Sequence, residues 1–515
     1  MKIHLLLMCV VLLAVKNGES ARILAAIPTA SYSHQVFFQM LWRELAIRGH
    51  DVVVLTTDPT HENLTNFKEI DMSSAYAAMK GAIKDVIALN DNKMKAFARF
   101  SSAFLEMSEH ELALPQVQEL IKDENQKFDL VMLEYLYPSF YAFKHRFNCS
   151  FIGVTSLEGT NTAHDVMGNP THAIMYPTSL LDLDGDKGFK DRLVSFLLNQ
   201  LIYFTRGKTV NLINELNKKH FGDNYPDIQE LAQSVDMLFV NANPMFAEVR
   251  PLTPSTISVS GGMHMKPPKD LPVELKKFLD ESSQGVVYFS MGSNVKSKDL
   301  SNETRNVIME TFSQLPYNVL WKFEADDLPG KPENVKIIKW APQQDVLRHK
   351  NIKLFITQAG MQSLEEALFT HVPLITIPFL GDQDSNAAKV AEKELGLRLN
   401  YKTLQVDEFK AAINEVITNP KYKNNITKLA LQIQDQPMTP LEKAVWWTEY
   451  VLRHKSGQHL KGPKIPTYQY YYLDVLAFLL ACLVSVTMST FYLCRFAYRF
   501  AIGLSQRVTI KIKKA

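Results

Sequence analysis

The stretch from Trp340 to Gln383 combines residue types that could bind a phosphorylated ligand. Within it, KLFIT is an apolar, β-branched run typical of a buried strand, Gln358 to Gly360 is a tight turn, and Met361 to Phe369 has helical spacing. A helix that begins directly after a tight turn points its unpaired backbone N–H groups and the positive end of its dipole at whatever lies before it. The sequence therefore predicts a diphosphate site at this turn.

The residues of this stretch resemble the signature of the UDP-glycosyltransferases, in particular the membrane-bound animal branch with UDP-glucuronosyltransferases and insect UDP-glucosyltransferases. The positions that match the spacing of the signature are Trp340, Gln343, Gln358, Ala359, Gly360, Gln362, Ser363, Glu366, Pro373, Pro378, Asp382 and Gln383. The resemblance extends over nearly the whole chain. It implies an α/β protein with the GT-B fold, in which two Rossmann-like domains face each other across a cleft. Ligands in such sheets bind outside the carboxyl ends of the strands.

The resemblance implies that this stretch binds a UDP-sugar donor. Trp340 would stack on uracil and Gln343 would contact the base or the ribose, with a buried structural tryptophan as the alternative at position 340. The ionised carboxylate of Glu366 would accept hydrogen bonds from two ribose hydroxyls. Its neighbour Glu365 is expected on the helix surface.

Two further groups of residues complete the expected donor site. The diphosphate would be surrounded by Gln358, Gly360, Gln362 and Ser363, together with Ser290, Gly292 and Ser293 of the turn FSMGS. The hydroxyls of the transferred sugar would be bound by Asp382 and Gln383, for which a loop or a helix cap is the alternative. Gln358 and Ala359 depart from the family, which often has histidine and glycine there. Alanine disfavours a positive φ.

The expected reaction needs a base, because a neutral alcohol or phenol attacks a sugar carbon poorly without losing its proton. His34 stands in SYSHQVFF, where the family keeps its catalytic histidine, and an imidazole can take up that proton near neutral pH. The family pairs this histidine with an aspartate, and the matching position here is Glu134 in FDLVMLE. Glutamate is one methylene longer and could still hold the imidazole tautomer, with altered reach. A histidine at a helix start without a chemical role is the alternative.

Neither a metal nor another cofactor is expected, since no Asp-x-Asp sequence and no His/Cys cluster offers a metal site. The lone histidines His264, His454 and His459 are expected on the surface. The first strand is not followed by GxGxxG, which disfavours a dinucleotide cofactor. Lys and Arg number 56 against 54 Asp and Glu, so the net charge of +2 gives no electrostatic reason to expect a nucleic acid partner.

Two β-α series are expected to position these residues. The first begins with the strand RILAAIP, a helix over Gln35–Arg48 and the strand DVVVLTT, which places His34 in the loop before the helix. The second begins at GVVYFSMGS. We predict an acceptor domain over residues 21–260, a linker over 261–284 and a UDP-sugar domain over 285–437. The helical run over 438–458 resembles the family's helix that crosses back to the first domain; packing on the nearer domain is the alternative.

The ends of the chain predict a membrane protein. Residues 1–20, with Lys2 before the run LLLMCVVLLAV, are typical of a secretory signal peptide. An uncharged transmembrane helix over 473–494 precedes a basic cytosolic tail over 495–515, which predicts a single-pass type I protein with lumenal domains. Sequons at Asn63, Asn148, Asn302 and Asn425 agree with that side. The end KIKKA resembles an endoplasmic reticulum retrieval signal; a basic tail that follows the positive-inside rule is the alternative.

These features predict an endoplasmic reticulum UDP-glycosyltransferase that transfers a hexose, with inversion, to small lipophilic alcohols, phenols or acids. Detoxification or hormone conjugation is the expected purpose. Gln358 with GMQS and EEAL resembles the insect members, which favours glucose over glucuronate. Two alternatives remain: a dedicated steroid-hormone glucosyltransferase, and a catalytically weak binding or carrier protein that keeps the fold. The acceptor and the oligomeric state stay open.

Overall fold

The computed structural model describes residues 20–89, 93–172, 175–176, 188–247, 249–463 and 465–514. The chain divides into two compact units, Met1–Lys461 and Gly462–Ala515. The signal peptide expected over residues 1–20 lies outside the described residues, apart from Ser20.

The first unit contains two parallel sheets of the doubly wound type. The first sheet has the order β3-β2-β1-β4-β5-β6-β7, and its strands are β1 (Arg22–Ile27), β2 (Asp51–Thr56), β3 (Phe67–Asp71), β4 (Leu130–Glu134), β5 (Ser150–Thr155), β6 (Met237–Val240) and β7 (Thr256–Ser258). The second has the order β10-β9-β8-β11-β12-β13, with β8 (Val286–Ser290), β9 (Asn318–Lys322), β10 (Val335–Ile338), β11 (Ile352–Thr357), β12 (Leu374–Thr376) and β13 (Gly396–Arg398). All neighbouring strands pair in parallel. The predicted pair of Rossmann-like sheets is thus confirmed.

Helices cover both faces of each sheet, because alternate residues of the buried strands point to opposite faces. One face of the first sheet packs against α2 (Tyr32–Ile47) and α17 (Pro440–His454). The other face packs against η2 (Pro138–Tyr141), α5 (Pro115–Lys122), α6 (Ala142–Phe147), α8 (Phe189–Phe221) and α9 (Ile228–Gln233). Helices α3 (Tyr76–Ala88), α4 (Lys93–Leu112) and α7 (Asn161–Met167) and the turn η1 (Ser73–Ala75) complete this half.

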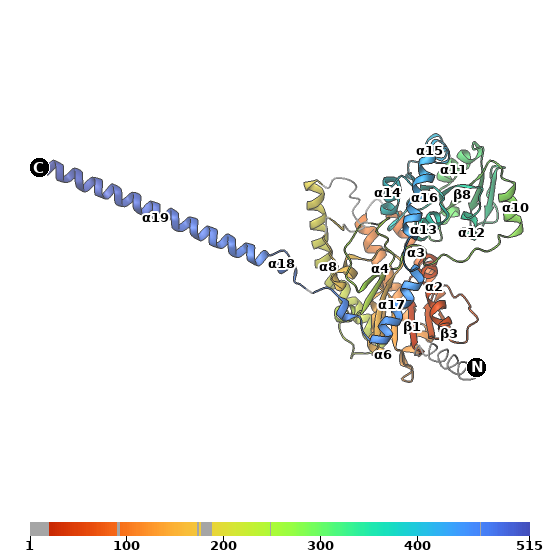
Figure 1. Cartoon of the computed structure of the whole chain (residues 1–515), viewed down its shortest axis with the longest axis horizontal. Helices are drawn as coiled ribbons and strands as arrows, with labels where there is room; N and C mark the ends of the chain where they lie inside the picture. The colour runs from red at the N-terminus through yellow and green to blue at the C-terminus, as the bar shows by residue number, and fades with distance from the viewer. Residues whose placement is uncertain are drawn as a thin grey trace, which may run out of the picture. The chain divides into compact units, whose positions relative to one another are not determined.

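The second sheet is covered in the same way. Helices α11 (Asn302–Ser313) and α15 (Val406–Thr418) pack on one face. The other face packs against α10 (Val273–Glu281), α12 (Gln343–Leu347), α13 (Met361–Thr370), α14 (Gln383–Glu392) and α16 (Pro420–Gln434). Short turns lie at η3 (Ser297–Asp299) and η4 (Gln458–Leu460). Although α17 follows this half in sequence, it lies beside α2 of the first half (Figure 1).

Both sheets change their strand order at one point, where the chain passes from one side of the first strand to the other. In the first sheet this switch point lies between β1 and β4, and in the second between β8 and β11. Loops that leave the carboxyl ends on either side of a switch point diverge and leave a crevice for ligands. Glu134 and Ser290 are the last residues of β4 and β8, and the segments that carry His34 and Gln358 follow β1 and β11.

The helix that carries His34 begins earlier than the sequence predicts. Ser31 has extended dihedrals, and its carbonyl accepts hydrogen bonds from the N–H groups of His34 and Gln35 at 3.0 and 3.4 Å. The helical hydrogen bonds therefore start at Ser31. His34 is the third residue of α2 and not, as predicted, part of the preceding loop.

The second unit contains α18 (Thr467–Tyr470) and the long helix α19 (Leu473–Lys514). Within α19, Leu473–Ser505 is long and apolar enough to cross a membrane. The sequence predicts that the transmembrane helix ends at residue 494, but α19 continues beyond this residue into the basic tail.

Candidate active site

A cavity of about 1330 Å³ lies where the loops at the carboxyl ends of the two sheets meet. The expected site residues that line it are His34, Ser290, Gly292, Ser293, Trp340, Gln343, Gln358, Gly360, Gln362, Ser363, Glu366, Asp382 and Gln383. Glu134 does not line the cavity but contacts His34. The structure therefore brings every residue of the predicted site to one place.

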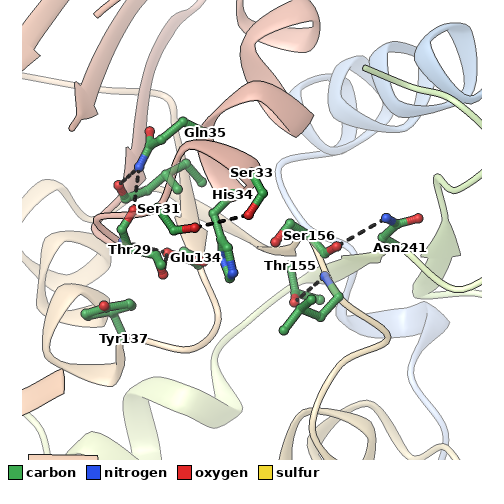
Figure 2. A network of polar contacts seen from close by, with 12 residues as sticks. Thr29, Ser31, Ser33, His34, Gln35, Glu134, Tyr137, Thr155, Ser156 and Asn241 are labelled. Carbon is green, nitrogen blue, oxygen red and sulfur yellow. Dashed lines mark hydrogen bonds and ion pairs between the residues drawn. The ribbon is translucent and has the colours of Figure 1, made fainter. Parts of the chain in front are cut away.

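His34 and Glu134 form a hydrogen-bonded pair at the wall of the cavity (Figure 2). The Nδ1 atom of His34 lies 2.6 Å from Oε1 of Glu134, whose side chain is fully buried. An ionised carboxylate can only accept hydrogen bonds, so Nδ1 carries the proton and Nε2 keeps its lone pair. The imidazole thus has the tautomer that a general base needs.

The strand register explains why these two side chains meet. Strand β4 runs parallel to β1 with Ala26 opposite Leu133, so Glu134 ends its strand beside the residues that lead into α2. The second oxygen of Glu134 accepts hydrogen bonds from the backbone N–H and the hydroxyl of Thr29, at 3.0 and 2.7 Å. These bonds fix the carboxylate, and the longer side chain of glutamate spans the distance to His34.

Trp340 follows β10 and remains 53 % exposed on the cavity wall. The alternative of a buried structural tryptophan does not apply. Its ring and that of Tyr32 meet at right angles with the ring centroids 5.1 Å apart, and the Nζ atom of Lys322 lies 5.2 Å from the Trp340 ring centroid. An exposed indole in a cavity offers a flat apolar surface to a planar base.

Gln343, Ser363 and Glu366 form one network beside this tryptophan. The amide nitrogen of Gln343 donates to Oε2 of Glu366 at 2.7 Å and to the hydroxyl of Ser363 at 2.9 Å. Burial raises the pKa of Glu366, but the contact with His264 and the hydrogen bonds from Gln344 and Gln343 outweigh it, and the net pKa lies below its ordinary value. Glu366 is thus an ionised acceptor at the cavity wall.

The turn after β11 packs tightly against the turn after β8. Gly292 has a φ of +73°, and a Cβ atom there would lie 2.3 Å from Nε2 of Gln358, so a larger residue would be strained and would displace the Gln358 amide. The Oε1 atom of Gln358 is buried and has no hydrogen-bond partner in the described part of the chain. Ala359 has a φ of 68°, the positive value that alanine disfavours.

Asp382 and Gln383 lie at the start of α14, on the cavity wall. Asn386 donates to Asp382 at 2.7 Å and to the carbonyl of Ala359 at 3.0 Å, which joins this helix to the turn after β11. Burial raises the pKa of Asp382, and the hydrogen bond from Asn386 opposes that rise. The side-chain oxygen of Gln383 accepts hydrogen bonds from two backbone N–H groups. Its amide nitrogen therefore points away from these two groups.

Side-chain contacts join the two halves at the cavity. Besides the Tyr32–Trp340 contact, the hydroxyl of Ser31 donates to Oδ1 of Asn294 at 3.1 Å. The amide of Gln362 donates to the carbonyl of Ser156 at 3.1 Å. Gln362 therefore lines the cavity, while its amide binds the other half of the protein.

Lys322 is a cavity residue that the sequence analysis missed. Its side chain is buried, and Nζ donates to the carbonyl of Gly292 at 2.9 Å and to Glu324 at 2.8 Å. Lysine is rarely buried without a partner. Its position directly after the apolar run NVLW, at the carboxyl end of β9, is the signal that could have identified it.

Two surface predictions were wrong. His264 is 0 % exposed, and Glu365 is also buried, whereas His454 and His459 are exposed as expected. Both buried residues lie where the segment after β7 crosses α13, so tertiary packing, which the local pattern does not show, removes them from solvent. Among the residues that the structure describes, no cluster of three or more His, Cys, Asp or Glu side chains could hold a metal ion.

Comparisons with known proteins agree with this geometry. The family model described as UDP-glucoronosyl and UDP-glucosyl transferase matches residues 22–508. The chain is 35 % identical to UDP-glycosyltransferase UGT5 of Dactylopius coccus, over 94 % of each chain. It is 32 % identical to the ecdysteroid UDP-glucosyltransferase of Spodoptera littoralis nuclear polyhedrosis virus, over 94 % of this chain and 98 % of the relative.

Proteins of lower identity are also glycosyltransferases by name. UDP-glucuronosyltransferase 2B14 of Oryctolagus cuniculus is 30 % identical over 85 % of this chain and 86 % of its own. The spinosyn forosaminyltransferase SpnP has a similar structure, with a TM-score of 0.57 at 15 % identity, and covers 84 % of this chain and 99 % of its own. The two doubly wound sheets, the cavity between them and these matches lead to one conclusion: the chain belongs to the UDP-glycosyltransferase family and has the GT-B fold.

Proposed function

We propose that the protein transfers a hexose, with glucose favoured over glucuronate, from a UDP-sugar to small lipophilic alcohols, phenols or acids. The observation that carries this proposal is that His34, hydrogen-bonded to Glu134, lines the same cavity as the expected donor residues. One cavity thus holds a base for the acceptor and polar groups for the donor.

In the proposed reaction, Nε2 of His34 removes the proton of the acceptor hydroxyl as its oxygen attacks the anomeric carbon. Glu134 stabilises the imidazolium that forms. UDP leaves from the opposite face, so the configuration at the anomeric carbon inverts. The N-terminus of α13 and the turn after β8 stabilise the charge on the leaving diphosphate.

Two arguments support glucose as the sugar. Several relatives are named UDP-glucosyltransferase, among them UDP-glucosyltransferase 2 of Dactylopius coccus at 32 % identity. In addition, the expected sugar residues include the carboxyl group of Asp382, and glucuronate would bring a second carboxylate beside it. The ecdysteroid names of three viral relatives make a steroid alcohol the second candidate for the acceptor.

For its location, we propose a single-pass endoplasmic reticulum protein with a cleaved signal peptide and lumenal catalytic domains. The apolar helix over Leu473–Ser505 supports a membrane anchor. The sequons at Asn63, Asn148 and Asn302 lie at exposed positions that a glycosylating enzyme can reach, whereas Asn425 is half-buried. Detoxification or hormone conjugation is the proposed purpose.

The test uses membranes that contain the full chain, with UDP-glucose and UDP-glucuronate offered side by side to a panel of phenols, aliphatic alcohols and steroids. We expect faster transfer from UDP-glucose. His34→Ala should lower kcat by on the order of 10²–10⁴-fold, while UDP binding persists. The matched control is His454→Ala, at an exposed histidine of α17. Equal or reversed rates with the two donors would reject the preference for glucose, and UDP binding without turnover would favour a carrier protein.

A further inference from the structure

His264 lies in the segment between β7 and α10 and is fully buried against α13. Its Nδ1 atom is 3.4 Å from Oε2 of Glu365, and its Nε2 atom is 3.5 Å from Oε1 of Glu366. Neither ring nitrogen has a hydrogen-bond partner of good geometry among the described residues. The imidazole therefore lies between two carboxylates, with one nitrogen facing each.

The imidazole and the two carboxyl groups differ in how their pKa values are shifted. Burial lowers the pKa of His264, but its contacts with Glu366 and Glu365 outweigh this and raise the pKa overall. Burial raises the pKa of Glu365, whereas that of Glu366 is lowered. Since two adjacent buried carboxylates resist ionising together, the imidazolium and the Glu366 carboxylate form the charged pair.

No lysine or arginine substitutes for His264 within the described ranges. The salt bridges found for Glu365 and Glu366 there are those to His264, and the nearby Arg348 pairs with Asp345. The remaining partners of Glu366 are the neutral amides of Gln343 and Gln344. Removal of the imidazole would leave a buried carboxylate without a counter-charge, and such a group protonates.

The backbone holds His264 in this position. Gly262 has a φ of +88°, and a Cβ atom there would lie 2.3 Å from the ring of Phe369, so the chain crosses α13 at close range. The N–H of Gly261 donates to Glu365 at 2.9 Å, and the amide of Gln344 donates to the carbonyl of His264 at 3.2 Å. The imidazole thus has a fixed orientation toward both glutamates.

We propose that His264 is a positioning residue of the donor site: as an imidazolium between Glu365 and Glu366, it keeps Glu366 ionised and oriented to accept hydrogen bonds from the ribose hydroxyls of UDP. This inference rests on the proposed function of Glu366. It gives a segment outside the signature stretch a role in donor binding. A protonated Glu366 would instead offer one donor and a weaker acceptor to the same hydroxyls.

The test compares the dissociation constants of UDP and 2′,3′-dideoxy-UDP, because their ratio isolates the ribose hydroxyls. In the full-length protein we expect UDP to bind more tightly by on the order of tenfold to hundredfold. His264→Gln should bring this ratio toward one and raise the KM for the UDP-sugar, with kcat changed less than threefold. A merely structural role would weaken both ligands equally, and an unchanged ratio in His264→Gln would overturn the proposal.

Two further variants separate the possible failures. Glu365→Gln removes the carboxylate that does not line the cavity, so the ratio should persist or rise; a fall toward one would contradict the proposal even if His264→Gln does not fold. Glu366→Gln should abolish the preference for UDP. A parent protein that does not bind UDP would reject the proposed function itself, and a full preference in Glu366→Gln would reject the role of Glu366.

Discussion

Replacement of Glu134 tests whether its contact with His34 has a catalytic purpose. Glu134→Gln keeps the shape of the side chain and removes its charge, so the imidazolium formed during proton transfer loses its counter-charge. Glu134→Asp keeps the charge but shortens the side chain by about one C–C bond, roughly 1.5 Å. The 2.6 Å contact with His34 would then open to about 4 Å unless the backbone moves.

The geometry sets the size of each effect. Two unit charges about 3 Å apart interact by roughly 5 kcal/mol at an effective dielectric constant of 20. The loss of this interaction in the transition state corresponds to a decrease of about 10³–10⁴-fold in kcat for Glu134→Gln. Glu134→Asp loses a hydrogen bond to a charged group, about 1.5–3 kcal/mol, and should lower kcat by roughly 10- to 100-fold.

The assay measures kcat and the KM for the UDP-sugar at saturating acceptor, with UDP binding measured separately. Both variants should keep the KM for the donor, because Glu134 does not line the cavity. The matched control is Glu111→Gln: Glu111 is also fully buried, and burial, followed by the nearby charge of Glu134, holds its pKa well above the ordinary value. This carboxyl is already neutral, so kcat should not change. A kcat of Glu134→Gln within tenfold of the parent would refute the role of the pair.

Three further predictions concern the donor site and stability. Trp340→Ala should weaken UDP binding by about tenfold in calorimetry, because stacking on a base contributes about 1–3 kcal/mol; unchanged binding would place uracil elsewhere. Ala359→Gly relieves about 1–2 kcal/mol of strain from the left-handed backbone conformation. Against this, it loses a buried methyl group, about 0.8 kcal/mol, and it raises the conformational entropy of the unfolded chain, which also destabilises the fold. The melting temperature of Ala359→Gly should therefore change little. Ala359→Val should have a lower melting temperature, because a β-branched residue tolerates the φ of 68° poorly. Burial lowers the pKa of His164 from 6.5 to about 4. Below about pH 6.5, His164 is therefore protonated in the unfolded chain but stays neutral in the folded chain. The free energy of unfolding should fall by about 3 kcal/mol between pH 6.5 and 4. His164→Gln should flatten this slope in denaturant titrations.

The sequence predicted the parts of the site that local pattern encodes. The apolar run before Gln358 is a strand, the turn and the helix start follow as expected, and the position of Glu134 at the end of β4 follows from the run FDLVMLE. These features depend on residues close together in the chain.

The missed features depend on contacts between distant segments. His264 and Glu365 seemed ordinary surface residues, because nothing nearby in the sequence shows that the chain crosses α13 at Gly262. Lys322 was missed because its burial depends on the turn at Gly292, from the neighbouring strand. The short strand β13 (Gly396–Arg398) has three residues, too few to show an alternating pattern.

The two sheets have the same strand order, so each sheet contributes its own set of residues to the site. Each sheet has its own switch point, so in the proposed reaction the first half would bind the acceptor and the second half the UDP-sugar. Segments of the first half other than Thr29, His34 and Glu134 could then vary in sequence, and with them the range of acceptors, without a change in the donor residues of the second half.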